Sequence, residues 1–325
     1  MYGKLVTLPL NAFVEVDNPT VPNQYFDSFN NHGQLDPIIA PLPNAFRIDN
    51  IVTCGNGFFK DFNNTGYMAQ MAPGSFSLKV MTTVGNDFMS GFNKDGVMRI
   101  PAGDSLNTST ITTIGNDFFK EFNLRGSFWT FPTGSFKLTQ INDHVPNGFF
   151  QSFNEEGQLA SLPTDSFIIT QLDTVGDEFF NSFNKGGKLL TLPTGSFMTH
   201  NIKSFGSRAF TFFNDNGYLS FLPAGSFTFD NILNVGNAFC QNFNASAGLQ
   251  SLPEGSFNIN TLSLRSRFEE SNEEKFQPNN GKKMQRNATY SSSVSPVIRG
   301  FHEFGMIFAE REREREREHE KKRRE

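Results

Sequence analysis

Residues 162–193 read LPTDSFIITQLDTVGDEFFNSFNKGGKLLTLP, and this pattern returns along most of the chain. Successive Phe-Asn pairs are separated by 33, 30, 30, 31, 30, 30 and 30 residues. Their phenylalanines are Phe29, Phe62, Phe92, Phe122, Phe153, Phe183, Phe213 and Phe243. A fixed period of this size indicates a repeat protein whose units stack along one axis. We therefore expect eight tandem units and a leading half-unit over residues 1–262, followed by a polar tail over residues 263–325.

A short helix is the first element expected in each unit. In the stretch quoted above, Val175, Phe179 and Phe183 are four residues apart, which places them on one face of a helix that begins after Gly176. Asn184 is expected to end this helix, because asparagine tolerates left-handed backbone angles. An apolar stripe on so short a helix has to be buried against another element.

A short strand is expected to follow, over residues 188–192. Gly187 turns the chain before this strand, and Pro193 closes it, since proline has no N–H to donate to a sheet. One strand and one short helix cannot form a core alone, but stacked copies can. The expected fold is therefore an α/β repeat solenoid, with a ladder of parallel strands and short helices.

Phenylalanine is expected to form the core of this solenoid. The chain holds 39 Phe against 5 Tyr and 1 Trp, although its hydrophobic fraction is only 37%. Burial of each Phe side chain contributes roughly 1.5–3 kcal/mol. The repeated asparagines are expected to form a structural ladder, with side chains bonded to neighbouring backbone, rather than a ligand site. The central members of this ladder are Phe153, Asn154, Phe183, Asn184, Phe213 and Asn214.

Charge and composition argue against several classes of partner. Residues 1–263 carry 13 Lys/Arg against 21 Asp/Glu, without a basic stripe, whereas proteins that bind nucleic acid need clustered cations to neutralise phosphates. No stretch approaches the roughly 18 apolar residues of a membrane helix. The five histidines occupy different places in the repeat, so they predict no metal site, and no cofactor-binding motif is present. Cys54 and Cys240 are too few for a disulfide framework and are expected to be small buried hydrophobes.

Exposed aromatic side chains are the best candidates for binding residues. Trp129 comes one position after the inward Phe128, so we expect it to point outward, and Tyr218 and Phe221 occupy comparable outward places. Exposed aromatic residues are frequent anchors of protein interfaces. The alternative interpretation is that these three side chains only cover the sheet.

The unit resembles the BspA-like leucine-rich repeat in the series Val175-Gly176, Phe179-Phe180, Phe183, Leu189 and Leu192-Pro193. Units of that family read Ile-Gly, Ala-Phe, Cys, Leu and a hydrophobic strand that ends in Pro. Phe179 takes the Ala place and Phe183 the Cys place. The Gly-Ser-Phe turn, as in residues 225–227, makes the present unit longer than the usual form. The resemblance implies a cell-surface adhesin that binds host, matrix or cell proteins and has no catalytic residues.

We therefore expect a non-catalytic protein-binding or adhesion solenoid, from a cell-surface or secreted protein if a signal peptide lies upstream. Met1 begins inside a unit, which favours a fragment of a longer chain. An intracellular repeat scaffold is the first alternative. A carbohydrate-active enzyme would need paired carboxylates that break the repeat, and none is found. The alternating Arg-Glu run over residues 310–318 leaves a truncated or misassembled reading frame as a further alternative.

Overall fold

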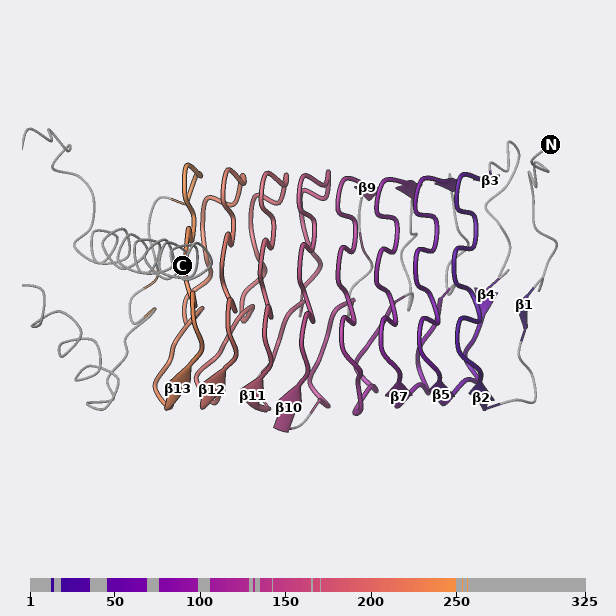
Figure 1. The fold of residues 1–325 in the computed structure, drawn as a ribbon, viewed down its shortest axis with the longest axis horizontal. Coiled ribbons are helices and arrows are strands. Elements are labelled where there is room, and N and C mark those ends of the chain that lie inside the picture. The colour runs from indigo at the N-terminus through magenta and orange to yellow at the C-terminus, as the bar shows by residue number, and fades with distance from the viewer. Residues whose placement is uncertain are drawn as a thin grey trace, which may run out of the picture.

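The computed structural model describes residues 13–14, 19–35, 46–68, 76–98, 106–128, 131, 135–141, 143–164, 166–169, 171–249, 253 and 256. Over these residues the chain forms similar coils that follow one another along a single long axis (Figure 1). Every strand pairing joins neighbouring coils in the parallel sense. The predicted tandem-repeat solenoid of parallel strands is thereby confirmed.

The strands are short, and all except β1 and β4 lie along two edges of the stack (Figure 1). One edge carries the sheet β3-β6-β8-β9, formed by Gln34–Leu35, Tyr67–Met68, Val97–Met98 and Ser127–Phe128. The opposite edge carries the sheet β2-β5-β7, formed by Thr20–Val21, Thr53–Cys54 and Thr83–Val84. It also carries the sheet β10-β11-β12-β13, formed by Asp143–Val145, Leu172–Val175, Ser204–Phe205 and Asn234–Val235. The remaining pair joins β1 (Phe13–Val14) to β4 (Phe46–Arg47).

The predicted short helices are wrong, because the described residues contain none. Val175, Phe179 and Phe183 are buried as expected, but Val175 ends strand β11 and the two phenylalanines lie in consecutive turns. The strand expected over residues 188–192 is not formed, although this segment is bonded to the preceding coil through Lys188 N to Gly157 O at 3.0 Å. The fold is therefore a β-solenoid rather than an α/β one.

Hydrogen bonds between coils replace the bonds of the expected helix. The amides of Phe180 and Ser182 donate to Ala209 O and Thr211 O of the next coil, at 2.7 and 2.8 Å. Asn181, between them, donates to Glu178 O three residues earlier, at 3.3 Å. The alternation requires left-handed backbone, with φ of +60° at Glu178, +57° at Ser182 and +52° at Asn184. A right-handed helix excludes such angles.

Glycine is needed where one coil touches the next most closely. A Cβ atom at Gly187 would lie 2.2 Å from Asn154 O and 2.4 Å from Asn184 Oδ1, and real Cβ atoms do not approach so near. Gly187 was expected to provide a left-handed turn, but the residue with positive φ is the preceding Gly186, at +62°. Gly66, Gly96, Gly126, Gly157 and Gly217 repeat this close approach along the stack.

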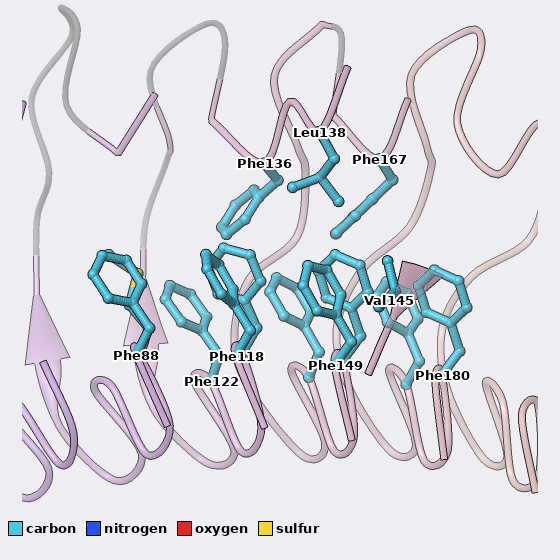
Figure 2. Close-up of a cluster of buried hydrophobic side chains, with 14 of the residues drawn as sticks. Phe88, Phe118, Phe122, Phe136, Leu138, Val145, Phe149, Phe167 and Phe180 are labelled. Atoms are coloured by element: carbon cyan, nitrogen blue, oxygen red, sulfur yellow. The ribbon is translucent and has the colours of Figure 1, made fainter. Parts of the chain in front are cut away.

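Phenylalanine columns fill the interior between the two edges. Phe62, Phe92 and Phe122 stack with nearly parallel rings, whose centroids are 5.1 and 5.4 Å apart. Figure 2 shows a second column, with Phe118 and Phe149, facing Phe136 and Phe167 from the other side of the coils. Rings of different columns meet edge to face, and both arrangements are favourable aromatic geometries. The core is therefore one continuous hydrophobic cluster along the stack, in which phenylalanine columns are interrupted at Met89 and Leu106.

Ser152→Gly is expected to raise the free energy of unfolding by about 0.5 kcal/mol, because relief of left-handed strain exceeds the added entropy of glycine in the unfolded chain. Ser152 has φ +56°, and Gly91 fills the corresponding place in an earlier coil with φ +68°. The matched control is Ser220→Gly, whose φ lies outside the left-handed region and which should lose about 0.5–1 kcal/mol. Urea unfolding compares the two variants, and a lower stability of Ser152→Gly would contradict the left-handed assignment.

Candidate functional site

An asparagine ladder runs through the stack beside the phenylalanine columns. Each side-chain Nδ2 donates to the Oδ1 of the asparagine in the next coil. The donor–acceptor distances, in order, are 2.6, 2.7, 3.1, 2.8, 2.9, 2.9 and 2.8 Å. The members are Asn30, Asn63, Asn93, Asn123, Asn154, Asn184, Asn214 and Asn244. Side chains from residues about thirty positions apart in sequence thus form one hydrogen-bonded chain.

The central rungs use all of the hydrogen-bonding capacity of the asparagine amide. Asn184 Nδ2 donates to Asn214 Oδ1 and to Leu189 O, at 2.9 and 3.3 Å. Its Oδ1 accepts from Asn154 Nδ2 and from Leu189 N, at 2.9 and 3.1 Å. An amide side chain has two donors and two acceptor lone pairs. The buried Asn184 therefore has no free hydrogen-bond donor or acceptor for a ligand. Its bonds connect neighbouring coils instead.

The Phe-Asn pairs singled out in the sequence meet as neighbours in the structure. Phe153, Phe183 and Phe213 form part of one column, with ring centroids 5.3 and 5.2 Å apart. Asn154, Asn184 and Asn214 follow directly after them and are fully buried. The ring of each pair packs in the core, and the following amide bonds along the stack axis.

A second polar ladder is formed by exposed Asn and Asp side chains of successive coils. It was not predicted from the sequence. Asn56 Oδ1 accepts from Asn86 N, and Asn86 Oδ1 accepts from Asn116 N, both at 2.8 Å. Asp177 continues the column and accepts from Ser207 N at 2.6 Å. The recurring Gly-Asn or Gly-Asp dipeptide is the signal, since a Cβ at Gly85 would lie 2.5 Å from Asn56 Oδ1.

Buried serines form a third ladder on the far side of the coil. Ser196 Oγ donates to Ser166 O at 2.8 Å, and Ser226 Oγ donates to Ser196 O at 2.9 Å. Ser256 Oγ continues the series to Ser226 O at 2.7 Å. These serines belong to the Gly-Ser-Phe turn and its Asp-Ser-Phe variant, so the turn provides a hydroxyl as well as an inward phenylalanine.

Two of the three predicted binding residues lie on one outer surface. Tyr218 and Phe221 are 50% and 55% exposed, and Leu190 in the neighbouring coil is 48% exposed. Ser220 N donates to Leu190 O at 3.2 Å, which sets the two segments side by side. We name residues 188–191 and 218–221 the 188–221 surface. Trp129 lies outside the described residues.

Lys188 adds a cation to the 188–221 surface. Its Nζ lies 3.9 Å from the centroid of the Tyr218 ring, a cation–π contact between adjacent coils. The hydrogen bond and the charge of Lys188 lower the pKa of the Tyr218 phenol. The ring of Tyr218 therefore packs against Lys188 and stays half exposed.

Ion pairs on the lateral surface also join neighbouring coils. Arg125 makes two bonds to Asp95, with Nε–Oδ1 at 2.6 Å and Nη2–Oδ2 at 3.0 Å. Lys203 Nζ lies 2.7 Å from Asp173 Oδ2. Both pairs are largely exposed, so each contributes roughly 0–1 kcal/mol and adds little to the aromatic and amide columns.

Titratable side chains are distributed over many of the described coils. Their His, Cys, Asp and Glu side chains form no group of three or more that would hold a metal ion. His32, His144 and His200 lie in different places of their coils, and His302 and His319 lie outside the described residues. Partial burial raises the pKa of Asp61 and of Asp117, which are separated along the stack. No helix with the length and hydropathy needed to cross a bilayer occurs in the described ranges.

Both cysteines are free and buried, as the sequence predicts. Cys54 pairs in register with Val21 on one side and with Val84 on the other. Burial raises the pKa of the Cys54 thiol to about 12 and also raises that of Cys240. A thiol reacts as the thiolate, so both side chains act as apolar packing rather than as nucleophiles.

Comparison with known proteins adds no relative. No family model matches the chain, no curated protein matches it, and no solved structure matches its fold. The resemblance to BspA-like leucine-rich repeats stays a prediction from the quoted residues.

Asn154→Asp is expected to lower the free energy of unfolding by about 3 kcal/mol or more, because it removes both donors of a buried rung and sets a carboxylate against Asn184 Oδ1. The control is Asn237→Asp, at an exposed position of the second polar ladder. This ladder already contains an aspartate, Asp177, in one of its coils. Thermal and urea unfolding measure both variants. Equal, small losses would show that the asparagine ladder contributes little to stacking.

Cys54→Val is expected to make stability less dependent on alkaline pH. The raised pKa means that the folded state holds the thiol proton more tightly than the unfolded state. This contribution is complete below the unfolded pKa of about 8.5 and is lost as pH rises toward about 12. Urea unfolding of both proteins between about pH 8 and pH 10.5 should show a steeper decline in the wild type. Parallel pH profiles would contradict the buried-thiol assignment.

Proposed function

We propose that this protein is a non-catalytic scaffold that binds a protein partner through the 188–221 surface. The observation that carries the proposal is the grouping of Leu190, Tyr218 and Phe221 on adjacent coils, each about half exposed. Aromatic side chains give large contact area at low entropic loss, and they dominate binding energy at interfaces. The lysine beneath Tyr218 suits a partner that combines an apolar contact with a nearby acidic group.

Rigidity of the scaffold supports the same proposal. The 188–221 surface lies over coils that are joined by the asparagine ladder, the serine ladder and the aromatic columns. A surface that is already ordered loses little conformational entropy on binding. The cell-surface or secreted placement is the part of the proposal that the resemblance to BspA-like repeats supports. An intracellular scaffold would use the same surface in the same way.

Tyr218→Ala/Phe221→Ala is expected to weaken partner binding by about tenfold or more without loss of folding, because both side chains are outward anchors. Binding is measured by biolayer interferometry of the full chain against a panel of purified extracellular-matrix proteins. The matched control is Val52→Ala/Leu233→Ala, two exposed apolar residues at the opposite edge, before β5 and β13. Equal effects of the two double variants, or no binding by the wild type, would reject the adhesion proposal.

A further inference from the structure

Asn63 combines two roles that conflict. The tripeptide Asn63-Asn64-Thr65 has the Asn-x-Ser/Thr pattern of an N-glycosylation acceptor. An acceptor asparagine is expected in a surface loop, because the glycan is bulky and hydrophilic. Asn63 is instead a fully buried rung of the asparagine ladder. Its neighbours in the acceptor pattern are more open, since Asn64 is partly exposed and Thr65 is exposed.

The bonds of the Asn63 amide leave no place for a sugar. Nδ2 donates one hydrogen to Asn93 Oδ1 at 2.7 Å and the other to Val97 O at 3.2 Å. A glycosylated amide keeps a single hydrogen, so at least one of these bonds has to break. The Oδ1 atom of the same amide is also closely packed, because a Cβ at Gly66 would lie 2.4 Å from it. The packing that excludes a single carbon at Gly66 cannot admit a sugar ring.

We propose that an N-glycan at Asn63 and the folded coil stack exclude each other, so the chain reaches its native state only where no glycan is transferred to this residue. In the transfer, Nδ2 forms a bond to the anomeric carbon of a lipid-diphosphate-linked oligosaccharide. The lipid diphosphate leaves, and one amide proton is released. The acceptor has to be accessible, so transfer precedes closure of the ladder. The inference is independent of what the 188–221 surface binds.

Three other acceptor patterns must be removed to isolate Asn63. They begin at Asn107, Asn244 and Asn287. Asn107 is partly exposed, and Asn244 is the last rung of the ladder and less buried than Asn63, while Asn287 lies outside the described residues. Ser109→Ala, Ser246→Ala and Thr289→Ala together give a background chain whose single acceptor pattern is the one at Asn63.

The test expresses the full background chain behind a cleavable secretion signal in human cells. Thr65→Ser keeps the acceptor pattern and Thr65→Ala removes it. The background chain and Thr65→Ser should carry a glycan that a peptide amidase removes, remain in the cell and be cut by limited proteolysis. Thr65→Ala should be unglycosylated, protease-resistant and secreted in severalfold larger amount.

Production of the same three chains in the bacterial cytosol controls for the substitution itself. Thr65 Oγ1 has exposed partners: it accepts from His32 N, donates to Asn31 Oδ1 and also contacts His32 Nδ1. All three chains should therefore show the same Tm when no glycan is transferred. The inference is overturned if the Asn63-glycosylated chain is as protease-resistant as Thr65→Ala. A secreted, protease-resistant background chain with Asn63 unmodified would support the exclusion, because the closed ladder would then have prevented transfer.

Discussion

The constraint on which the structure depends is the distance between coils, about 4.8 Å, at which each residue meets its counterpart one coil away. At this spacing a buried side chain has to be compatible with copies of itself. Phenylalanine satisfies the condition by offset stacking, with centroids 5.1 Å apart for Phe62 and Phe92. Asparagine satisfies it because its amide both donates and accepts, so the rung at Asn184 is bonded above and below. Charged side chains would repel their own copies, which confines them to the outer surface, where opposite charges alternate as in Asp173 and Lys203.

Left-handed backbone is a consequence of the same constraint. Amides that point along the stack axis must alternate with amides that close local turns, and this alternation forces positive φ at large residues such as Phe197 and Phe227. Each such residue is strained by about 1–2 kcal/mol. The strain persists because the surrounding bonds fix the conformation from both sides: Phe197 N donates to Phe167 O at 3.2 Å and Phe227 N to Phe197 O at 2.9 Å. Strain in one coil is thus offset by contacts with the coils beside it, and an isolated unit would lack those contacts.

The repeat period, the phenylalanine core and the burial of both cysteines could be predicted from the sequence, because each follows from which residues recur. The path of the backbone within a unit could not. The spacing of Val175, Phe179 and Phe183 fits one face of a helix, yet the same three side chains are buried equally well by turns. The choice depends on where the amides donate, and partners such as Ala209 O lie a whole repeat away in sequence. Two adjacent buried phenylalanines, Phe179 and Phe180, were the local sign against a narrow helical stripe.

Inward and outward side chains of the coils are under different constraints, and this difference indicates where a binding surface can form. At the edge that carries β3, β6, β8 and β9, the inward side chains of successive described coils are all large and apolar. They are Leu35, Met68, Met98, Phe128, Leu159, Leu189 and Leu219. The adjacent outward column varies in size, polarity and charge. Its members are Gln34, Tyr67, Val97, Ser127, Gln158, Lys188 and Tyr218. Stacking demands self-compatibility of the inner side chains only, so the outer ones are free to differ from coil to coil. A recognition surface can therefore be specified there without disturbing the fold, which is why Tyr218 and Phe221 carry the proposed function and the ladders do not.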